Sequence, residues 1–103
     1  MVNITETKVQ QVIAEIEKYM RQFSGYYSDW YVGITEDPRK RLFEDHQVKE
    51  KGDLWIYQDC GSESNAREVE EYFLKKGCDG GTGGGDYKTT YAYAYKKNPH
   101  TNP

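Results

Sequence analysis

The chain has 103 residues and a formal net charge of −3, which suits one domain with a single modest core and excludes two full domains. Tight, non-specific DNA binding by this domain alone is not expected, because counterion release requires a broadly basic surface. Two isolated cysteines without CxxC spacing disfavour a zinc site and indicate free thiols. With no signal peptide and no membrane-spanning apolar run, we expect a cytoplasmic protein.

Residues 5–23 are predicted to form the first helix, with an apolar stripe that packs against the core. Its apolar side chains recur at intervals of three and four: Val9, Val12, Ile13, Ile16, Tyr19, Met20 and Phe23. Thr7 with Gln10, or Asn3 with Glu6, would form a capping box at its start.

A strand and a second helix are predicted next. Residues 26–35 are rich in aromatic and β-branched side chains, which favours a strand. Asp37 is suited to cap a helix, and Pro38 to occupy its first turn. We expect this helix to continue to about residue 46 and to turn Leu42 and Phe43 inward.

Another strand and helix follow. Residues 54–59 are predicted to form a strand after a turn at residues 51–53. A helix is expected over residues 64–76, capped by Ser62 or Ser64 and ended by Gly77.

The last part of the chain is predicted to contain a glycine-rich connection, a strand and a tail. Residues 80–85 carry five glycines and one threonine, but no preceding strand and no following helix with Lys-Ser/Thr, so we interpret them as a connection and not as a phosphate cradle. Residues 89–95 alternate strictly, which places tyrosines on one strand face and small residues on the other. We expect one domain over residues 1–97 and a disordered tail over residues 98–103. If residues 89–95 were an unpaired terminal strand, their edge would allow a homodimer.

Tyr31, Arg41 and Glu70 are the candidate functional residues. Tyr31 lies on a predicted strand and Arg41 in the first turns of the helix that leaves it, so both can face one cleft. Glu70 lies at the core edge of a later helix, where a carboxylate is costly unless it meets a cation or a metal. Separately, each has a simpler interpretation. Tyr31 would pack within its strand, Arg41 would be a solvated cation on its helix, and Glu70 would be the salt-bridge partner of Arg41. Together they suit phosphodiester hydrolysis.

These residues carry a resemblance to a known family. The segment from Tyr31 to Thr35, followed by residues 37–42, resembles the second half of the GIY-YIG nuclease signature, including an arginine ten residues after the tyrosine. The segment from Ala66 to Lys75 is similar to the family's helix that bears the metal-binding glutamate, here Glu70. The resemblance implies an α+β fold with a small mixed sheet flanked by helices, here with an N-terminal helix and an extra C-terminal strand.

The first half of the signature is compressed. Gly25-Tyr26-Tyr27 lies only a few residues before Tyr31, too close for two full paired strands. Residues 89–95 are therefore a candidate replacement, predicted to pair with residues 30–35 and to supply a tyrosine: Tyr91, Tyr93 or Tyr95. Some members of the family carry a histidine one helical turn after the arginine. That position is Asp45 here, and His46 follows it, so in an α-helix His46 points elsewhere unless the helix ends early.

The resemblance implies a metal-dependent endonuclease that acts on DNA. Its implied catalytic residues are Tyr31 and Arg41, with Tyr27 and His46 as further candidates; Glu70 would bind Mg²⁺ or Mn²⁺. The alternative is a catalytically inactive descendant that uses the fold, and its tyrosine-rich sheet, as a protein or nucleic-acid interaction module. The acidic charge and the compressed first motif favour this alternative, whereas Tyr31, Arg41 and Glu70 together favour the enzyme.

Overall fold

A three-stranded antiparallel sheet lies at the centre of the computed structural model, which describes residues 7–81 and 85–103. The fold is α+β, as predicted, but the three strands are all antiparallel, whereas a mixed sheet was expected. In chain order the elements are α1 (Lys8–Met20), the 3-10 turn η1 (Tyr27–Asp29), β1 (Trp30–Thr35), the π-helical segment η2 (Lys40–Asp45), β2 (Trp55–Asp59), α2 (Glu63–Lys76) and β3 (Tyr91–Lys96). Across the described ranges, no helix is long and apolar enough to cross a membrane.

The helix α1 begins at the predicted capping box. The Thr7 hydroxyl accepts from the Gln10 backbone N–H at 3.1 Å, and the Gln10 side chain accepts from the Thr7 N–H at 2.9 Å. The other candidate box, Asn3 with Glu6, lies outside the described residues. The helix ends at Met20 and not at residue 23, because the backbone then tightens into a turn in which the Phe23 N–H bonds to the Met20 carbonyl at 3.1 Å.

The helix α2 also matches its predicted ends. Of the two candidate caps, Ser62 is used: its hydroxyl accepts from the Asn65 N–H at 3.1 Å. Gly77 ends the helix with φ of 116°, in the left-handed region that glycine adopts without a side-chain clash.

The strand order is β1-β3-β2, so the last strand of the chain is the central one. The predicted pairing of residues 89–95 with residues 30–35 is confirmed: β3 runs antiparallel to β1, from Trp30 opposite Lys96 to Thr35 opposite Tyr91. Because β2 pairs with its other side, β3 has no free edge. The homodimer edge that the sequence suggested on this strand is therefore not available for backbone pairing.

The first predicted strand is shorter than expected. Residues 27–29 form η1 and not the start of β1, because the Asp29 carboxylate accepts from the Tyr26 backbone N–H at 2.8 Å and closes a turn. The strand proper starts at Trp30.

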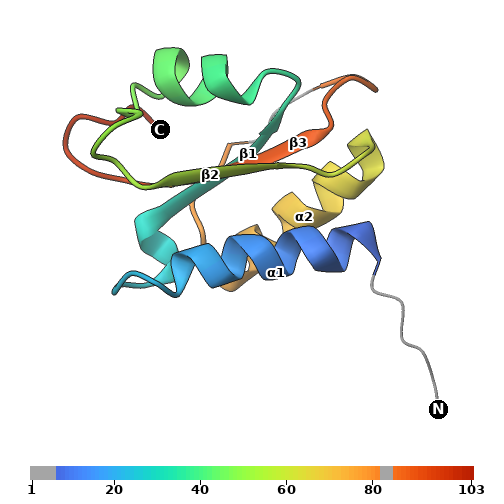
Figure 1. The fold of residues 1–103 in the computed structure, drawn as a ribbon, viewed down its shortest axis with the longest axis horizontal. Coiled ribbons are helices and arrows are strands. Elements are labelled where there is room, and N and C mark those ends of the chain that lie inside the picture. The colour runs from blue at the N-terminus through green and yellow to red at the C-terminus, as the bar shows by residue number, and fades with distance from the viewer. Residues whose placement is uncertain (1–6, 82–84) are drawn as a thin grey trace.

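The two faces of the sheet carry different side chains and are covered by different layers (Figure 1). The helices α1 and α2 lie on one face, against Ala92 and Ala94, while η2, drawn in green, lies on the other, above Tyr93 and Tyr95. The alternation predicted for the last strand thus divides the core into a side covered by α1 and α2, which receives the alanines of β3, and a side covered by η2, which receives its tyrosines.

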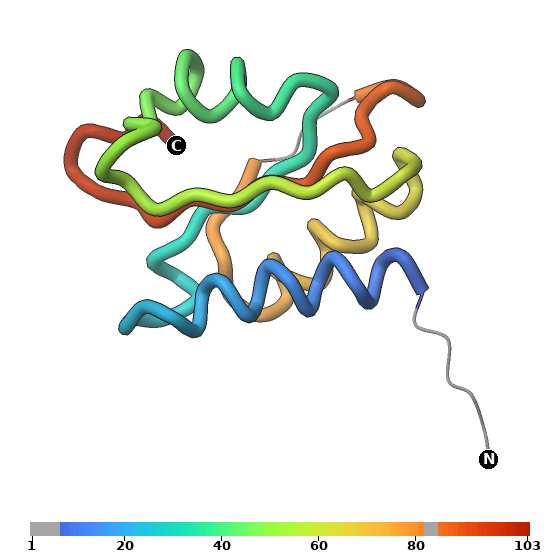
Figure 2. Tube along the Cα trace, viewed as in Figure 1, coloured from blue at the N-terminus to red at the C-terminus, as the bar shows by residue number. Residues whose placement is uncertain are grey.

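The end of the chain returns to η2 and does not form the disordered tail predicted from the sequence. Residues 98–102 lie beside the segment that follows η2 (Figure 2), where the Asn102 N–H donates to the His46 carbonyl at 2.8 Å. The Asn98 side-chain amide donates to Asp53 at 3.0 Å. The local sequence gives no sign of this, because both partners are distant along the chain.

Candidate active site

The π-helical segment η2 determines where Arg41 and His46 lie. Asp37 caps the start of this helical region: its carboxylate accepts a hydrogen bond from the Lys40 N–H at 3.1 Å. The segment ends with an i→i+5 hydrogen bond, 2.9 Å long, from the His46 N–H to the Arg41 carbonyl. In an α-helix, a residue five positions after Arg41 is rotated by about 140° from it. The π turn accommodates one additional residue, so the expectation that His46 points elsewhere is corrected: His46 is buried against the sheet.

His46 is hydrogen-bonded through both ring nitrogens. Its Nε2 is 2.8 Å from the Tyr93 hydroxyl, and its Nδ1 is 2.7 Å from the Asn102 carbonyl oxygen. The Tyr95 hydroxyl lies 3.1 Å from Nδ1. Burial lowers the pKa of His46, with Arg41 acting in the same direction, so the ring is neutral near pH 7.

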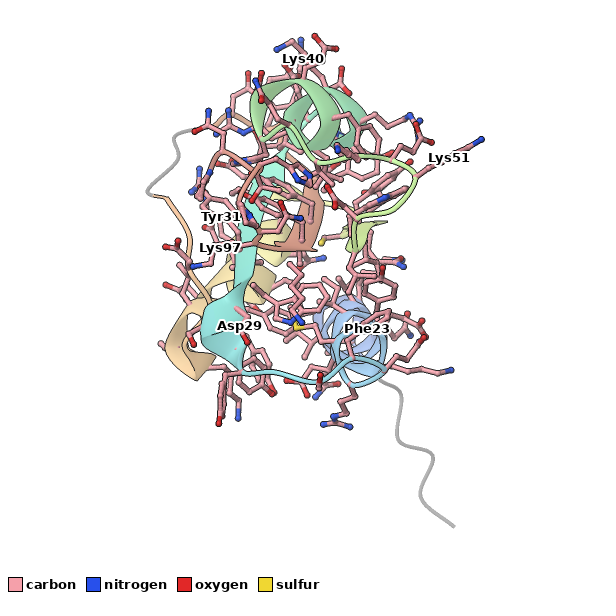
Figure 3. The ribbon with its side chains drawn as sticks, turned by 90° about the vertical axis from the view of Figure 1, so that its left-hand side faces the viewer. Phe23, Asp29, Tyr31, Lys40, Lys51 and Lys97 are labelled. Carbon is pink, nitrogen blue, oxygen red and sulfur yellow. The ribbon has the colours of Figure 1, made fainter. Side chains whose placement is uncertain are left out.

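Tyr31 packs on the same side of the sheet. Its ring stacks on Tyr95 with centroids 5.3 Å apart and lies 4.7 Å from the His46 ring. Figure 3 shows Tyr31 in the part of the molecule that carries η2 and Lys40, away from Phe23. Burial raises the pKa of Tyr31, while Arg41 opposes the shift and so does a hydrogen bond with the Gly81 backbone.

Tyr93 lies beside both His46 and Arg41. It is 1% exposed, and burial raises its pKa, although its interaction with Arg41 opposes this. The same interaction, followed by the one with Asp45, raises the pKa of Arg41. The guanidinium donates its hydrogen bond to Asp45, at 3.2 Å. A guanidinium, a phenol hydroxyl and a neutral imidazole thus form one cluster, in which the hydroxyl and the imidazole are hydrogen-bonded.

A cleft of about 430 Å³ opens beside this cluster. Arg41 lines it together with Lys40 and with four carboxylate residues: Glu36, Asp37, Asp45 and Asp86. Neither Tyr31 nor Glu70 is among the described residues that line it. With more acidic than basic side chains, the cleft would hold a phosphodiester better in the presence of a divalent cation.

Glu70 approaches from the opposite layer. It lies on α2, on the face of the sheet opposite η2, and its charge makes a small contribution that raises the pKa values of Tyr31 and Tyr93. Burial raises the pKa of Glu70 itself, and Arg67 opposes this. Arg67 donates instead to Glu63, at 2.7 Å. Over residues 7–81 and 85–103, no side chain forms a hydrogen bond or an ion pair with Glu70.

Tyr27 does not join this cluster. Its hydroxyl donates to the buried Glu17 carboxylate at 3.0 Å, and the Tyr72 hydroxyl donates to the same oxygen at 2.7 Å. These contacts connect η1 to α1 and α2 on the side of the sheet that the two α-helices cover. Tyr27 is therefore held in a structural network, apart from Arg41.

The structure thus brings together Tyr31, Arg41 and His46. Glu70 lies on α2 in the other layer, and among the described residues its side chain makes no hydrogen bond or ion pair with this cluster. Tyr93 was only one of three tyrosines proposed from the alternating pattern, and the pattern alone does not distinguish them. Asn102 carried no signal in the sequence, because its contact is made by a backbone carbonyl.

Comparisons with known proteins add no identification: no family model, no curated protein and no solved structure matches the chain. Within the described part of the chain, no group of three or more His, Cys, Asp or Glu side chains is placed to hold a metal ion. Cys60 and Cys78 are buried free thiols.

Proposed function

We propose that this protein is a metal-dependent phosphodiester endonuclease of the GIY-YIG type that acts on DNA. The observation that carries the proposal is the buried hydrogen bond between Tyr93 and His46, with the Arg41 guanidinium beside it. This pair lies next to Tyr31, the tyrosine of the motif. A structural core has no need of a guanidinium beside a buried Tyr–His hydrogen bond, whereas phosphodiester hydrolysis needs a cation and a proton acceptor side by side.

The chemistry follows from the hydrogen bonds. Because the neutral His46 accepts at Nε2, the Tyr93 hydroxyl donates its proton there and keeps its oxygen lone pairs for other partners. When water attacks phosphorus, its proton would pass to the Tyr93 oxygen while the Tyr93 proton moves to His46. Arg41 would neutralise the charge that develops on the phosphoryl oxygens, and Tyr31 would orient the attacking water.

Glu70 fits a divalent cation. It is a half-buried carboxylate without a hydrogen-bonding or ion-pairing partner in the described ranges, and burial raises its pKa. Mg²⁺ typically keeps several waters and uses one or two carboxylates together with substrate phosphates. A cation held by Glu70 would supply stabilisation of the leaving oxygen when bound.

Nicking of supercoiled plasmid in the presence of Mg²⁺ or Mn²⁺ tests the proposal. We expect nicking by the wild type, and losses of about 100-fold or more in Arg41→Lys and Glu70→Gln, the scale of removing one transition-state contact. Arg39→Lys and Glu68→Gln are matched controls, since both residues are exposed on the same two helical segments. Nicking that survives Glu70→Gln would contradict the role of Glu70 in metal binding.

The interaction module is the second candidate, and one observation favours it: Tyr31 is 8% exposed and Tyr93 only 1%. Such burial suits a core whose catalytic role has been lost. A folded wild type that binds DNA or protein but nicks no plasmid with either metal would support this function over the nuclease.

A further inference from the structure

Residues 98–102 form a latch, held in place by Asp53. The Asp53 carboxylate accepts from the Asn98 side-chain amide at 3.0 Å and is paired with His100. It also accepts from the Lys49 N–H at 2.7 Å, so the latch is tied to the turn before β2. Burial raises the pKa of Asp53, but the hydrogen bonds from Lys49 and His100 outweigh it and hold that pKa below its usual value.

The latch is closed internally and ends on His46. Thr101 and Asn98 bond to each other twice through their backbone N–H groups: Thr101 to the Asn98 carbonyl at 3.1 Å, and Asn98 to the Thr101 hydroxyl at 3.0 Å. Asn102 then clamps His46 at two points. Its N–H donates to the His46 carbonyl at 2.8 Å, and its carbonyl lies 2.7 Å from the ring Nδ1.

The second contact decides which nitrogen of the ring carries the proton. A backbone carbonyl only accepts, so Nδ1 must be the donor. In the neutral ring Nε2 is then the acceptor, and it faces the Tyr93 hydroxyl at 2.8 Å. Partners of the second nitrogen are known to fix the tautomer of a functional histidine in this way.

We propose that the latch of residues 98–102 is a positioning element that holds His46 as its Nδ1–H tautomer, with Nε2 directed at the Tyr93 hydroxyl. Without the Asn102 carbonyl, the proton can move to Nε2, and the ring would then donate to Tyr93 and no longer accept from it. The catalytic consequence rests on the proposed nuclease function, whereas the tautomer itself does not.

The charged and titratable groups around His46 come from three elements. Arg41 and Asp45 belong to η2, Tyr31 to β1, and Tyr93 and Tyr95 to β3. None of them fixes the proton on Nδ1 as the Asn102 carbonyl does. Asp45 is paired with Arg41 and with Lys40, and the Tyr95 hydroxyl, 3.1 Å from Nδ1, can either donate or accept. The latch is therefore the part of the site that selects the tautomer.

The test is ¹⁵N NMR of the imidazole rings in the full chain. The chain has two histidines, and His46→Gln assigns their signals. We expect the wild-type His46 to show a protonated Nδ1 and an unprotonated Nε2 at neutral pH. In Asn98→Ala/His100→Ala, which removes both side-chain contacts to Asp53, we expect a mixture of the two tautomers.

Asn102→Ala is the matched control, since it keeps both backbone groups and should leave the tautomer unchanged. If the double variant does not fold, Asn102→Pro removes the backbone N–H that holds residue 102 against the His46 carbonyl. Its own carbonyl is then no longer fixed beside Nδ1, and the tautomer should shift in the same direction. A wild-type ring protonated at Nε2, or a folded variant that has lost the latch but keeps the Nδ1–H form alone, would overturn the proposal.

Plasmid nicking separates this proposal from the nuclease. We expect the double variant to lose about 10- to 100-fold in rate, the range for partners that orient a functional imidazole, and Asn102→Ala to lose nothing. If the His46 tautomer behaves as expected but the protein never nicks DNA, the nuclease function is overturned and the role of the latch stands. If the wild type nicks DNA but the double variant keeps the wild-type tautomer, the role of the latch is overturned and the nuclease function stands.

Discussion

Gly33 of β1 shows how one missing side chain allows the Tyr93–His46 contact. A Cβ placed at Gly33 would be 2.4 Å from the Tyr93 hydroxyl oxygen and 2.6 Å from its Cζ. The Tyr93 ring is fully enclosed, so it has no room to move aside. The role of Gly33 is steric: it leaves space for a hydroxyl that arrives from the neighbouring strand.

Gly33→Ala is therefore expected to destabilise the protein by about 1–3 kcal/mol, as overpacking of an enclosed site does. It should also weaken the hydrogen bond between Tyr93 and His46. Urea unfolding gives the first effect, and the ring ¹⁵N signals of His46 give the second. Gly52→Ala is the control, because a Cβ there meets nothing within 4 Å and only backbone strain at its φ of 110° is added. A His46 signal that changes equally in both variants would contradict the steric explanation.

Among the secondary-structure elements, η2 has the least favourable ending. Its last hydrogen bond closes at His46, and the next residue, Gln47, has φ of 58°. The left-handed region costs a non-glycine residue about 1–2 kcal/mol. By contrast, α2 ends at Gly77, which adopts its positive φ without that cost.

Gln47→Gly should consequently leave stability unchanged or raise it by up to about 1 kcal/mol, since relief of the left-handed strain exceeds the added freedom of the unfolded chain. Gly77→Ala should lower it by about 1 kcal/mol, because the nearest atom is 3.7 Å away and only strain is added. Thermal unfolding monitored by circular dichroism measures both changes. A clear loss of stability in Gln47→Gly would show that the glutamine contributes contacts that outweigh the strain of its backbone.

At the scale of the whole molecule, the elements could be predicted from the sequence and several of their connections could not. Thr7, Ser62 and Gly77 carry local signals for helix ends, and the alternation in residues 89–95 predicts a strand with two unlike faces. Its pairing with residues 30–35 was predicted because the segment before Tyr31 is too short to supply a partner strand. The π turn could not be predicted, because an i→i+5 bond has no compositional signature. Nor could the latch, whose Asn98–Asp53 bond joins residues 45 positions apart.

The stability of the whole molecule should depend on pH through His46. Burial lowers the pKa of His46 in the folded state below the value of about 6.5 expected in the unfolded chain. Between these two values the unfolded chain binds more protons, so stability is fully present above about pH 6.5 and falls as the pH is lowered below it, by at most about 1.4 kcal/mol per pH unit. The wild type should therefore lose stability as the pH is lowered below about 6.5.

His46→Gln should lose that part of the dependence, measured as the difference between wild type and variant in urea unfolding across this range. The comparison with the variant is needed because Glu70 acts with the opposite sign. Burial raises its folded-state pKa, so its contribution favours the folded state at low pH and fades as the pH rises through that pKa. Asn102→Ala is the control: it keeps His46 and the backbone contacts of the latch to the ring, so its pH dependence should match that of the wild type. If wild type and His46→Gln show the same pH dependence, the folded ring takes up its proton as readily as the unfolded one. A buried ring beside Arg41 should not do so, and the explanation would be wrong.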